Sequence, residues 1–356
     1  MALAPPSADT VARALEQFPA LRGASAAPLS GGLINQSFAV TAEDGEYVLQ
    51  RVHPVFAPEV HENIAAVTER LRERGEPSPR LQVSRGGRPW ADLGAEGIWR
   101  VMTRLPGLSF DRVQGPEQAR AAGALVGRFH AALGDLEFEF KALRLGVHDT
   151  PAHLRTLSQA LAEHGQHRLF PEVDELAAQI VAGYGALPLP GEVPLRVCHG
   201  DLKFNNILFS GTGPEEQVVT TGIIDLDTVG RMPLHHELGD AWRSWCNRGG
   251  EDQKAASFDL EVFAASLEGY LKTANTLALA PEERRALVHG VEWISLELAA
   301  RFAADALREA YFGWDRARFP AAGEHNLLRA QGQWAMHRAA LQTREARAGL
   351  LQVDAG

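Results

Sequence analysis

Strand-forming segments between residues 195 and 225 interrupt a part of the chain that is otherwise helical, and this interruption constrains the fold most. The segments LRVCH, NILF and VTTGIID are short and apolar, as buried strands are. Polar loops lie between them. At 356 residues, 45% of them hydrophobic, the chain is long enough to bury such strands in one large domain or two smaller ones.

The first 100 residues or so have a mostly β pattern. A glycine-rich bend precedes two strand-like runs, and Asp44-Gly45 predicts a hairpin between them because both residues tolerate positive φ. Apolar residues then recur at helical spacing up to Gly75. The predicted elements are a short helix capped by Ser7, strands within 27–53, a helix over 58–74, and strands over 81–90 and 97–105.

Helical patterns dominate after about residue 107. We therefore expect an α+β fold with two lobes and a cleft. The small lobe, residues 1–104, would hold an antiparallel sheet and one helix, and the larger lobe, residues 105–356, would be mainly helical. The predicted helices cover 117–133, a segment that begins at Thr150-Pro151, 171–186, 252–275, 281–310 and 325–349.

The composition excludes several classes of partner. A net charge of -10 and a pI near 5.7 disfavour binding to nucleic acid or to an anionic membrane, so a phosphate-bearing ligand needs local cations, backbone amides or a metal. Cys198 and Cys246 are too few for a disulfide framework. The chain shows no signal peptide and no apolar run of ~18 residues, so we expect a cytoplasmic protein. The sequence does not select an oligomeric state, and a monomer or a weak dimer is the open expectation.

Polar residues cluster where two of the interrupting strands end. In HGDLKFNN, Asp201 follows one strand and Asn206 comes five residues later, and in GIIDLDTVG, Asp225 and Asp227 follow another. Side chains beyond strand ends project into clefts, so these groups can converge without being neighbours in sequence. Magnesium prefers such oxygen ligands and takes one or two carboxylates from a protein. The pattern therefore predicts a magnesium site that binds nucleotide phosphates.

In this arrangement Asp201 is free to accept a proton from an attacking hydroxyl, and Lys203 can neutralise a transferring phosphoryl group. Taken singly, Asp201 or Asp225 has a simpler role as a cap of a helix or turn. Their joint spacing favours the site. Asp227 is either a third carboxylate at the metal or an acid on the substrate side, and His199 is expected to be structural.

HGDLKFNNILF followed by IIDLDTVG resembles the catalytic and metal motifs of the aminoglycoside phosphotransferase and choline kinase superfamily. These are small-molecule kinases with a protein-kinase-like fold. The resemblance implies ATP and Mg²⁺ as cofactors, Asp201 as the base, and Asn206 and Asp225 as metal ligands. Further similar segments are LSGGLINQSFAV in the phosphate-covering loop, YVLQRV in the third strand, GEPSPRL, the linker LPGLSF and the helix GALVGRFHAAL.

A narrower resemblance concerns the acceptor. GGLINQSF, HENIAAVTERL and LELAARFAADAL are similar to segments of the N-acetylhexosamine 1-kinase branch, which phosphorylates the anomeric hydroxyl of a sugar. This implies transfer to that hydroxyl of an N-acetylhexosamine or a related hexose. The sequence selects neither one sugar nor ATP over GTP.

The third strand departs from the protein-kinase pattern, because Gln50 and Arg51 stand where a lysine would hold the phosphates. Adjacent strand residues face opposite ways, and a guanidinium grips phosphate bidentately, so we expect Arg51 to bind phosphate, oriented by Glu62; the alternative is a surface arginine. The other expected nucleotide contacts are backbone groups of Gly31, Gly32 and Asn35, in what is otherwise a simple turn, and of Thr103 and Leu105 in the linker.

The segment WISLELAARFAADALREAYF holds a charged stripe, since Glu297, Arg301 and Asp305 follow each other at four-residue spacing. It is either a solvated face with acid–arginine pairs or, with Glu297 and Arg301 binding substrate, part of a sugar pocket. Further candidates for substrate contact are Tyr311, His325 and Asn326.

Three rival hypotheses remain open at this point. A kinase of the same fold would act on an aminoglycoside, choline or homoserine instead. A metal-dependent hydrolase would use the acids and histidines of PLHHELGDAW; we discount it because Asp240 stands where the superfamily has an aspartate that supports the catalytic loop. A non-catalytic nucleotide-binding module would bind Mg-ATP without turning it over.

Overall fold

The computed structural model describes residues 3–21, 23–29, 34–143, 146–188, 191–211 and 218–354. The chain divides into two compact units. Two segments from beyond residue 104 thus pack with the N-terminal strands. The first unit comprises Met1–Leu108, Ala132–Leu143 and Leu208–Gly230, and the second comprises Ser109–Ala131, Arg144–Ile207 and Arg231–Gly356.

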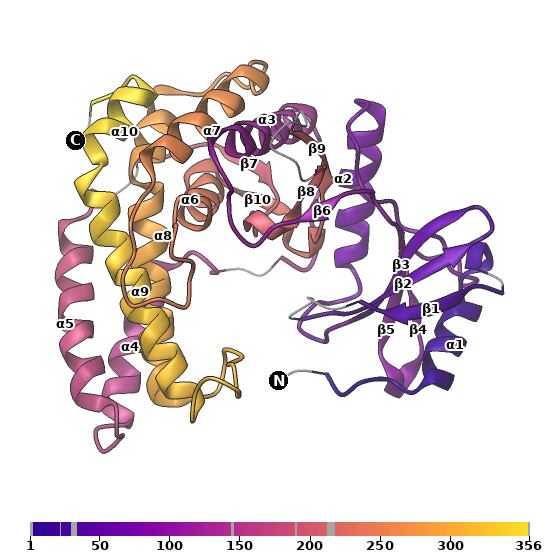
Figure 1. Ribbon diagram of the computed structural model, residues 1–356, viewed down its shortest axis with the longest axis horizontal. Coiled ribbons are helices and arrows are strands. Elements are labelled where there is room, and N and C mark those ends of the chain that lie inside the picture. The colour runs from indigo at the N-terminus through magenta and orange to yellow at the C-terminus, as the bar shows by residue number, and fades with distance from the viewer. Residues whose placement is uncertain are drawn as a thin grey trace. The chain divides into compact units, whose positions relative to one another are not determined.

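The first unit is built on a five-stranded sheet with the order β1-β2-β3-β5-β4, in which each neighbouring pair is antiparallel (Figure 1). Two helices accompany it. The elements are β1 (Ser25–Pro28), β2 (Gln36–Ala42), β3 (Gly45–Val52), β4 (Ala91–Asp92), β5 (Ile98–Thr103), α1 (Ala8–Glu16) and α2 (Val60–Glu73).

The two faces of this sheet carry different residues. Tyr47 and Leu49 of β3 pack in one core with Ala14 of α1 and Phe18. Because strand side chains alternate in direction, Gln50 lies on the opposite face. This alternation decides which polar residue of β3 faces the acidic motif, which is the segment GIIDLDTVG with Asp225 and Asp227.

Local signals explain the ends of most elements in this unit. Ser7 caps α1 by accepting the N–H of Thr10 at 3.1 Å, and β2 and β3 pair through Ala42 and Gly45, so both predictions are confirmed. The strand predicted over 81–90 pairs only at its start, where Leu81 bridges Met102 and the N–H of Gln82 donates to the carbonyl of Val101 at 2.8 Å. The side chain of Ser84 donates to the carbonyl of Trp90 at 2.8 Å and turns the chain back on itself, so β4 begins only at Ala91.

The second unit is mainly helical, and α8 (Pro281–Arg308) lies at its centre in contact with α4, α5, α6, α9 and α10. The segment Leu226–Thr228 forms one turn, η4, in the first unit, and Phe204–Asn206 forms η3 in the second. The other elements are α3 (Pro116–Leu133), α4 (Thr150–Glu163), α5 (Phe170–Ala186), α6 (Leu234–Trp245), α7 (Leu260–Thr273), α9 (Ala322–Gln342) and α10 (Arg344–Leu351).

Short strands complete the fold in two small sheets, with the orders β6-β8-β9 and β10-β7. The predicted strand segments around the polar loops are therefore confirmed. Among the described residues, none of the helices combines the length and the hydrophobicity that crossing a bilayer requires. The strands are β6 (Leu108–Ser109), β7 (Leu195–Cys198), β8 (Ile207–Ser210), β9 (Val219–Ile223) and β10 (Gly230–Pro233).

The helix predictions hold with three differences. Asp259 caps α7 by accepting the N–H groups of Glu261 and Val262, so this helix starts later than expected. The predicted helix over 325–349 is divided at Thr343 into α9 and α10. The helix α6 had no predicted range.

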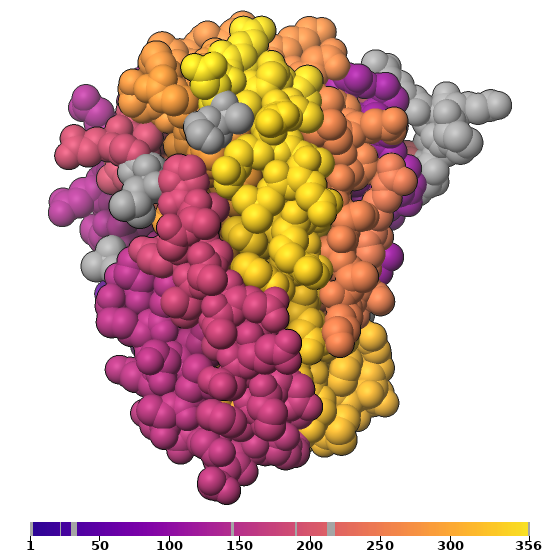
Figure 2. All heavy atoms as spheres, turned by 90° about the vertical axis from the view of Figure 1, so that its left-hand side faces the viewer, coloured from indigo at the N-terminus to yellow at the C-terminus, as the bar shows by residue number. Residues whose placement is uncertain are grey.

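The outer face of the second unit is formed by α5 and α9, which run side by side with α10 above them (Figure 2). Trp334 of α9 packs over Gly183 of α5 and donates its indole N–H to Gln179 at 2.8 Å. The buried Glu292 of α8 receives hydrogen bonds from Arg344 at 2.6 Å and Arg347 at 2.5 Å. These bonds fix α10 onto α8.

A close helix crossing fixes α6 on α8. A Cβ added at Gly239 would lie 2.6 Å from the backbone of Gly290, and one added at Gly290 would lie 2.5 Å from the carbonyl oxygen of His235. Backbone atoms cannot yield in the way a flexible side-chain end can. Only glycine fits at both positions, and the crossing sets the place of every residue on α6.

We expect Gly239→Ala to lower the free energy of unfolding by about 1–3 kcal/mol, because its methyl group would force the two helices apart. Gly185→Ala is the matched control, since nothing lies within 4 Å of a Cβ there and alanine is the better helix former. Urea unfolding of both variants checks this. Equal stability of the two variants would contradict the close crossing.

Candidate active site

The loop between β7 and β8 presents Asp201 and Lys203 in the second unit. The side chain of Asp201 is 27% exposed and that of Lys203 is 40% exposed. The ammonium nitrogen of Lys203 lies 3.1 Å from Oδ1 of Asp201. A carboxylate and a cation are thus held together at the surface of this loop, where both can meet a ligand.

Glu237 of α6 holds the backbone of this loop. Its carboxylate accepts the N–H of His199 at 2.7 Å and the N–H of Gly200 at 2.8 Å. Gly200 has a φ of 84°, which a residue with a Cβ adopts only with strain. The ring nitrogen Nδ1 of His199 accepts the N–H of Asp201 at 3.2 Å, so His199 has the structural role expected of it.

Glu237 is buried, with 1% of its side chain exposed, and His130 of α3 lies 3.3 Å from it. Burial alone would raise the pKa of Glu237, but the bond from His130, the charge on His130 and the backbone donors outweigh it and lower the pKa below its ordinary value. The carboxylate therefore stays ionised and acts as a fixed acceptor beneath the loop.

Asn206 closes the same loop. Its side-chain N–H donates to the carbonyl of Asp201 at 2.8 Å. This bond orients the amide and leaves Oδ1 available as a ligand, and a neutral oxygen of this kind suits Mg²⁺. Asn206 therefore fits the role of one protein ligand of the predicted metal ion.

The charge of Lys203 is stabilised from a second side. Burial would lower the pKa of Lys203, but the carboxylates of Asp201, Glu251 and Asp240 outweigh it and raise the pKa. Arg243 joins the last two, donating to Asp240 at 2.8 Å and to Glu251 at 2.6 Å. Glu237 thus binds the backbone of the loop, while Asp240 acts on the loop through the charge of Lys203.

In the first unit, Asp225 stands at the end of β9 and starts η4 with a left-handed backbone, at a φ of 66°. The side chain of Asp227 is buried, and its Oδ2 accepts from Asn35 at 2.6 Å and from Arg100 at 2.9 Å. A second bond joins Arg100 to Oδ1. Burial raises the pKa of Asp227, but Arg100 and Asn35 outweigh this and lower it. Both oxygens of Asp227 are thus occupied by protein groups.

The structure does not bring Arg51 and Glu62 together, so the predicted pairing is wrong. Arg51 lies on the α1 face of the sheet, where it donates to the carbonyl of Glu96 at 2.8 Å and that of Ala4 at 3.2 Å. Glu62 of α2 forms an ion pair with Lys141. The reason is the alternation of side chains along β3, which places Gln50 and not Arg51 on the opposite face of the sheet. There the side-chain oxygen of Gln50 accepts a hydrogen bond from Nε of Arg100 at 2.9 Å.

Of the remaining candidates for nucleotide contact, Thr103 and Leu105 lie within the described residues. Thr103 pairs with Arg80, and its hydroxyl accepts the N–H of Arg80 at 2.9 Å. Leu105 packs so closely on Gly222 that a Cβ there would lie 2.4 Å away. Gly31 and Gly32 lie outside the described residues.

The charged stripe of α8 does not form acid–arginine pairs. Glu297 is buried and accepts from Thr150 at 2.9 Å, while Nδ1 of His148 lies 3.1 Å from its other oxygen. Arg301 lies over the ring of Phe312 at 5.6 Å. Within the described residues, Arg301 has no hydrogen bond or ion pair, so it is the member of the stripe with a cation left for a ligand.

The end of α8 explains Asp305 and its neighbours. Asp305 accepts three backbone N–H groups, among them that of Tyr311 at 2.9 Å, and the amide of Asn326 at 2.9 Å. The two ring nitrogens of His325 meet Asp252 at 2.9 Å and the N–H of Asp315 at 3.1 Å. Asn326 and His325 are buried, whereas the side chain of Tyr311 is exposed.

A buried cluster of His130, Cys198 and Glu237 has the donor types of a metal site. Protein groups already engage each member. His130 meets Tyr270 at 3.1 Å, the thiol of Cys198 donates to Met232 at 3.8 Å, and burial raises the pKa of Cys198 well above its ordinary value. The cluster is therefore a hydrogen-bonded core under the loop, and it gives no support to the hydrolase hypothesis.

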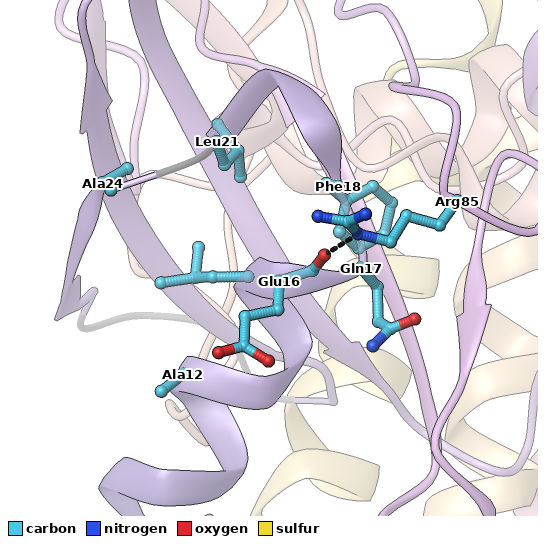
Figure 3. Close-up of a pocket in the computed structure, with 9 residues that line it drawn as sticks. Ala12, Glu16, Gln17, Phe18, Leu21, Ala24 and Arg85 are labelled. Atoms are coloured by element: carbon cyan, nitrogen blue, oxygen red, sulfur yellow. Dashed lines mark hydrogen bonds between the residues drawn. The ribbon is translucent and has the colours of Figure 1, made fainter.

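A pocket of about 510 Å³ lies at the end of α1 in the first unit. Arg85 reaches across it and donates to the carbonyl of Glu16 at 2.6 Å (Figure 3). Phe18 and Leu21 form its apolar side. The lining residues that the structure describes include none of the predicted site residues.

Comparison with known proteins decides the family. Residues 25–320 match the model of the phosphotransferase enzyme family, which is most of the chain. The chain belongs to this family. It is a phosphotransferase, as its loop motifs predicted, and the expected two-lobed, protein-kinase-like α+β fold is confirmed.

Relatives of this phosphotransferase differ in their named acceptors. It is 24% identical over 296 residues to a homoserine kinase of Methylobacillus flagellatus, covering 83% of this chain and 81% of that protein. An amicoumacin kinase in complex with AMP-PNP and Ca²⁺ has a TM-score of 0.57 at 13% identity, covering 98% and 96% of the two chains. An aminoglycoside phosphotransferase of Alicyclobacillus acidocaldarius has 0.55 at 16% identity, covering 97% and 98%.

Sequence reasoning did not identify the two residues that bind the polar motifs. Glu237 binds the backbone of HGDLKFNN, and Arg100 binds Asp227 of GIIDLDTVG. Arg100 did leave a signal, because it is a charged residue between Trp99 and Val101 in a predicted strand, and a buried charge requires a partner. Glu237 left none beyond its place in an unassigned polar run, since its partners are backbone groups.

We expect Glu237→Gln to slow phosphoryl transfer about 10-fold or more and to lower the free energy of unfolding by about 1–3 kcal/mol, because one backbone donor would face an amide N–H. The exposed Glu175→Gln on α5 is the control. Fixed-time activity assays measure the rate of phosphoryl transfer, and urea unfolding measures the free energy of unfolding.

The stability difference depends on pH. Because folding lowers the pKa of Glu237 from its ordinary 4.5, its contribution is present in full above that pH and declines as the pH falls further. The difference between wild type and Glu237→Gln should shrink on acidification. A constant difference from pH 7 to pH 3 would contradict the ionised acceptor.

Proposed function

We propose that this protein transfers the γ-phosphoryl group of ATP to a hydroxyl group of a small molecule, most specifically the anomeric hydroxyl of an N-acetylhexosamine or a related hexose. The observation that carries the proposal is the loop of Asp201 and Lys203, whose side chains are both partly exposed on a backbone that the buried Glu237 holds in place. Phosphoryl transfer requires placement of charge more than covalent chemistry from the protein.

Asp201 accepts the proton of the acceptor hydroxyl while the oxygen of that hydroxyl attacks the γ-phosphorus and ADP leaves. The side chain is suited to this, because it is partly exposed and its backbone is fixed at His199 and Asn206. Lys203 beside it neutralises charge on the transferring group. The loop thereby orients one reactant and stabilises the negative charge that develops.

Asn206 and Asp225 bind magnesium in this proposal, which rests on the sequence motif and on the chemistry of their oxygens. The ion would neutralise the nucleotide phosphates and stabilise the leaving group. Asn206 offers Oδ1 with its N–H groups turned to the backbone, and Asp225 offers a carboxylate at a strand end. The nucleotide analogue and Ca²⁺ in the amicoumacin kinase complex support a nucleotide with a divalent ion.

The acceptor is inferred from the N-acetylhexosamine 1-kinase resemblance and from Arg301. Its guanidinium lies over Phe312 without a hydrogen bond or ion pair to any described residue, and it can donate to sugar hydroxyls or to an N-acetyl carbonyl. Glu297, His325 and Asn326 are held by protein partners, and we assign them the task of shaping this region. The exposed Tyr311 is a further candidate for contact with the acceptor.

Homoserine is the second candidate acceptor. The kinase of Methylobacillus flagellatus that is 24% identical to this chain is named for that substrate. Arg301 also fits it, since a guanidinium pairs well with an amino-acid carboxylate. The two candidates thus share one cation and differ in the group that it binds.

Asp201→Asn should lower turnover by several orders of magnitude while the affinity for Mg-ATP changes little, because the amide keeps the shape but accepts no proton. Steady-state kinetics and nucleotide titration measure the two quantities separately. Near-normal turnover would remove Asp201 from the role of base.

A panel of acceptors tests the substrate. ADP release from Mg-ATP should be fast with an N-acetylhexosamine and should vanish in Asp201→Asn. The panel should include plain hexoses, homoserine, an aminoglycoside and choline, with Arg301→Met as a companion variant. A response to homoserine alone would transfer the assignment to the second candidate, and no ADP release with any acceptor would contradict the proposed function.

A further inference from the structure

Three strands of the first unit carry a polar ladder on one face of the sheet. Ser37 of β2, Gln50 of β3 and Arg100 of β5 stand opposite one another in register. The amide of Gln50 donates to Ser37 at 2.9 Å and accepts from Arg100 at 2.9 Å. The hydrogen bonds of the ladder thus fix the orientation of the Arg100 guanidinium from the sheet side.

Arg100 extends this ladder to the acidic motif. It binds both carboxylate oxygens of Asp227, and the side chains of the two residues are 1% and 2% exposed. Asn35 donates to the same carboxylate at 2.6 Å and accepts the N–H of His53 at 2.9 Å. One carboxylate therefore connects the start of β2, the end of β3 and the middle of β5.

His61 of the neighbouring helix α2 adds no competing charge near pH 7. His61 of α2 is buried, stacks on Trp90 at 5.3 Å and lies near Arg100. Burial and the charge of Arg100 lower the pKa of His61 to about 4, so the ring is neutral near pH 7. Arg100 is then the cation that balances Asp227, and the two charges match one to one.

We propose that Arg100, Asp227 and Asn35 form a buried latch that fixes Asp225, two residues before Asp227, relative to the nucleotide-binding strands. Asp227 is a positioning residue that touches neither substrate nor metal. Gln50 and Arg100 occupy the face of the sheet that meets the acidic motif, and there Arg100 binds Asp227 and joins this motif to the sheet. This inference rests on the proposed function, because Asp225 is the proposed metal ligand.

The latch predicts a loss of affinity that depends on metal. Arg100→Met should weaken binding of Mg-AMP-PNP to the intact chain about 10-fold or more, as loss of a group that orients a ligand does, and leave binding of AMP-PNP in EDTA unchanged. The control is Arg13→Met, because Arg13 is an exposed arginine of the same unit with acidic partners. Titration calorimetry measures each affinity without turnover.

The sign of the change separates the latch from a direct metal ligand. If Asp227 were itself a ligand, removal of its cation would free the carboxylate and Mg-AMP-PNP would bind equally well or better, which would overturn the latch. An equal loss with and without metal would overturn it as well. If the wild-type protein did not bind Mg-AMP-PNP, both the proposed function and the latch would be contradicted. If the wild type bound it and Arg100→Met showed no loss of affinity, only the latch would be contradicted.

A second variant covers the case in which Arg100→Met does not fold. Arg100→Lys keeps the buried charge paired but loses the fork that binds both oxygens. It should fold and show a smaller loss of Mg-AMP-PNP affinity in the same direction. Unchanged or stronger binding in a folded Arg100→Lys would contradict the latch.

Discussion

A charge that is buried away from water is stable only where fixed partners balance it, and this constraint shapes both acidic motifs of the protein. Glu237 is balanced by two backbone N–H groups and His130, and it thereby fixes the loop of Asp201. Asp227 is balanced by Arg100 and Asn35. In each unit a buried ion thus fixes the backbone next to a candidate site residue, Asp201 in the second unit and Asp225 in the first.

The helical packing places Glu237 where it can do this. The crossing of α6 and α8 at Gly239 and Gly290 leaves no room for a side chain, so the depth of α6 is determined by backbone contact. Glu292 ties the same α8 to α10 through Arg344 and Arg347. Rigid support of this kind preorganises charge, which is how electrostatic catalysis avoids reorganisation during the reaction.

Local patterns in the sequence were sufficient for most elements and for the motifs. The hairpin at Asp44-Gly45 and the helix capped by Ser7 follow from neighbouring residues alone. The strand predicted over 81–90 pairs only at its start, because the Ser84 side chain competes for backbone groups that a longer strand would pair. Such competition depends on geometry that an alternating pattern does not contain.

The supporting residues were harder to predict because their partners are distant in sequence. Arg100 and Asp227 are 127 positions apart, and nothing local joins them. Alternation along β3 showed that Gln50 and Arg51 face opposite ways, but only packing of Tyr47 and Leu49 against α1 fixes which one faces the acidic motif. The motifs therefore predicted the family and the candidate site residues, whereas the buried partners of these residues were not predicted.

Direct observation of the phosphorylated product tests the central claim, which is transfer of a phosphoryl group to a hydroxyl. Phosphorus-31 NMR of the protein with Mg-ATP and an N-acetylhexosamine should show a new phosphate ester at the rate of ADP formation, coupled to the anomeric proton of the sugar. Inorganic phosphate as the only new phosphorus species besides ADP would contradict the account and indicate hydrolysis.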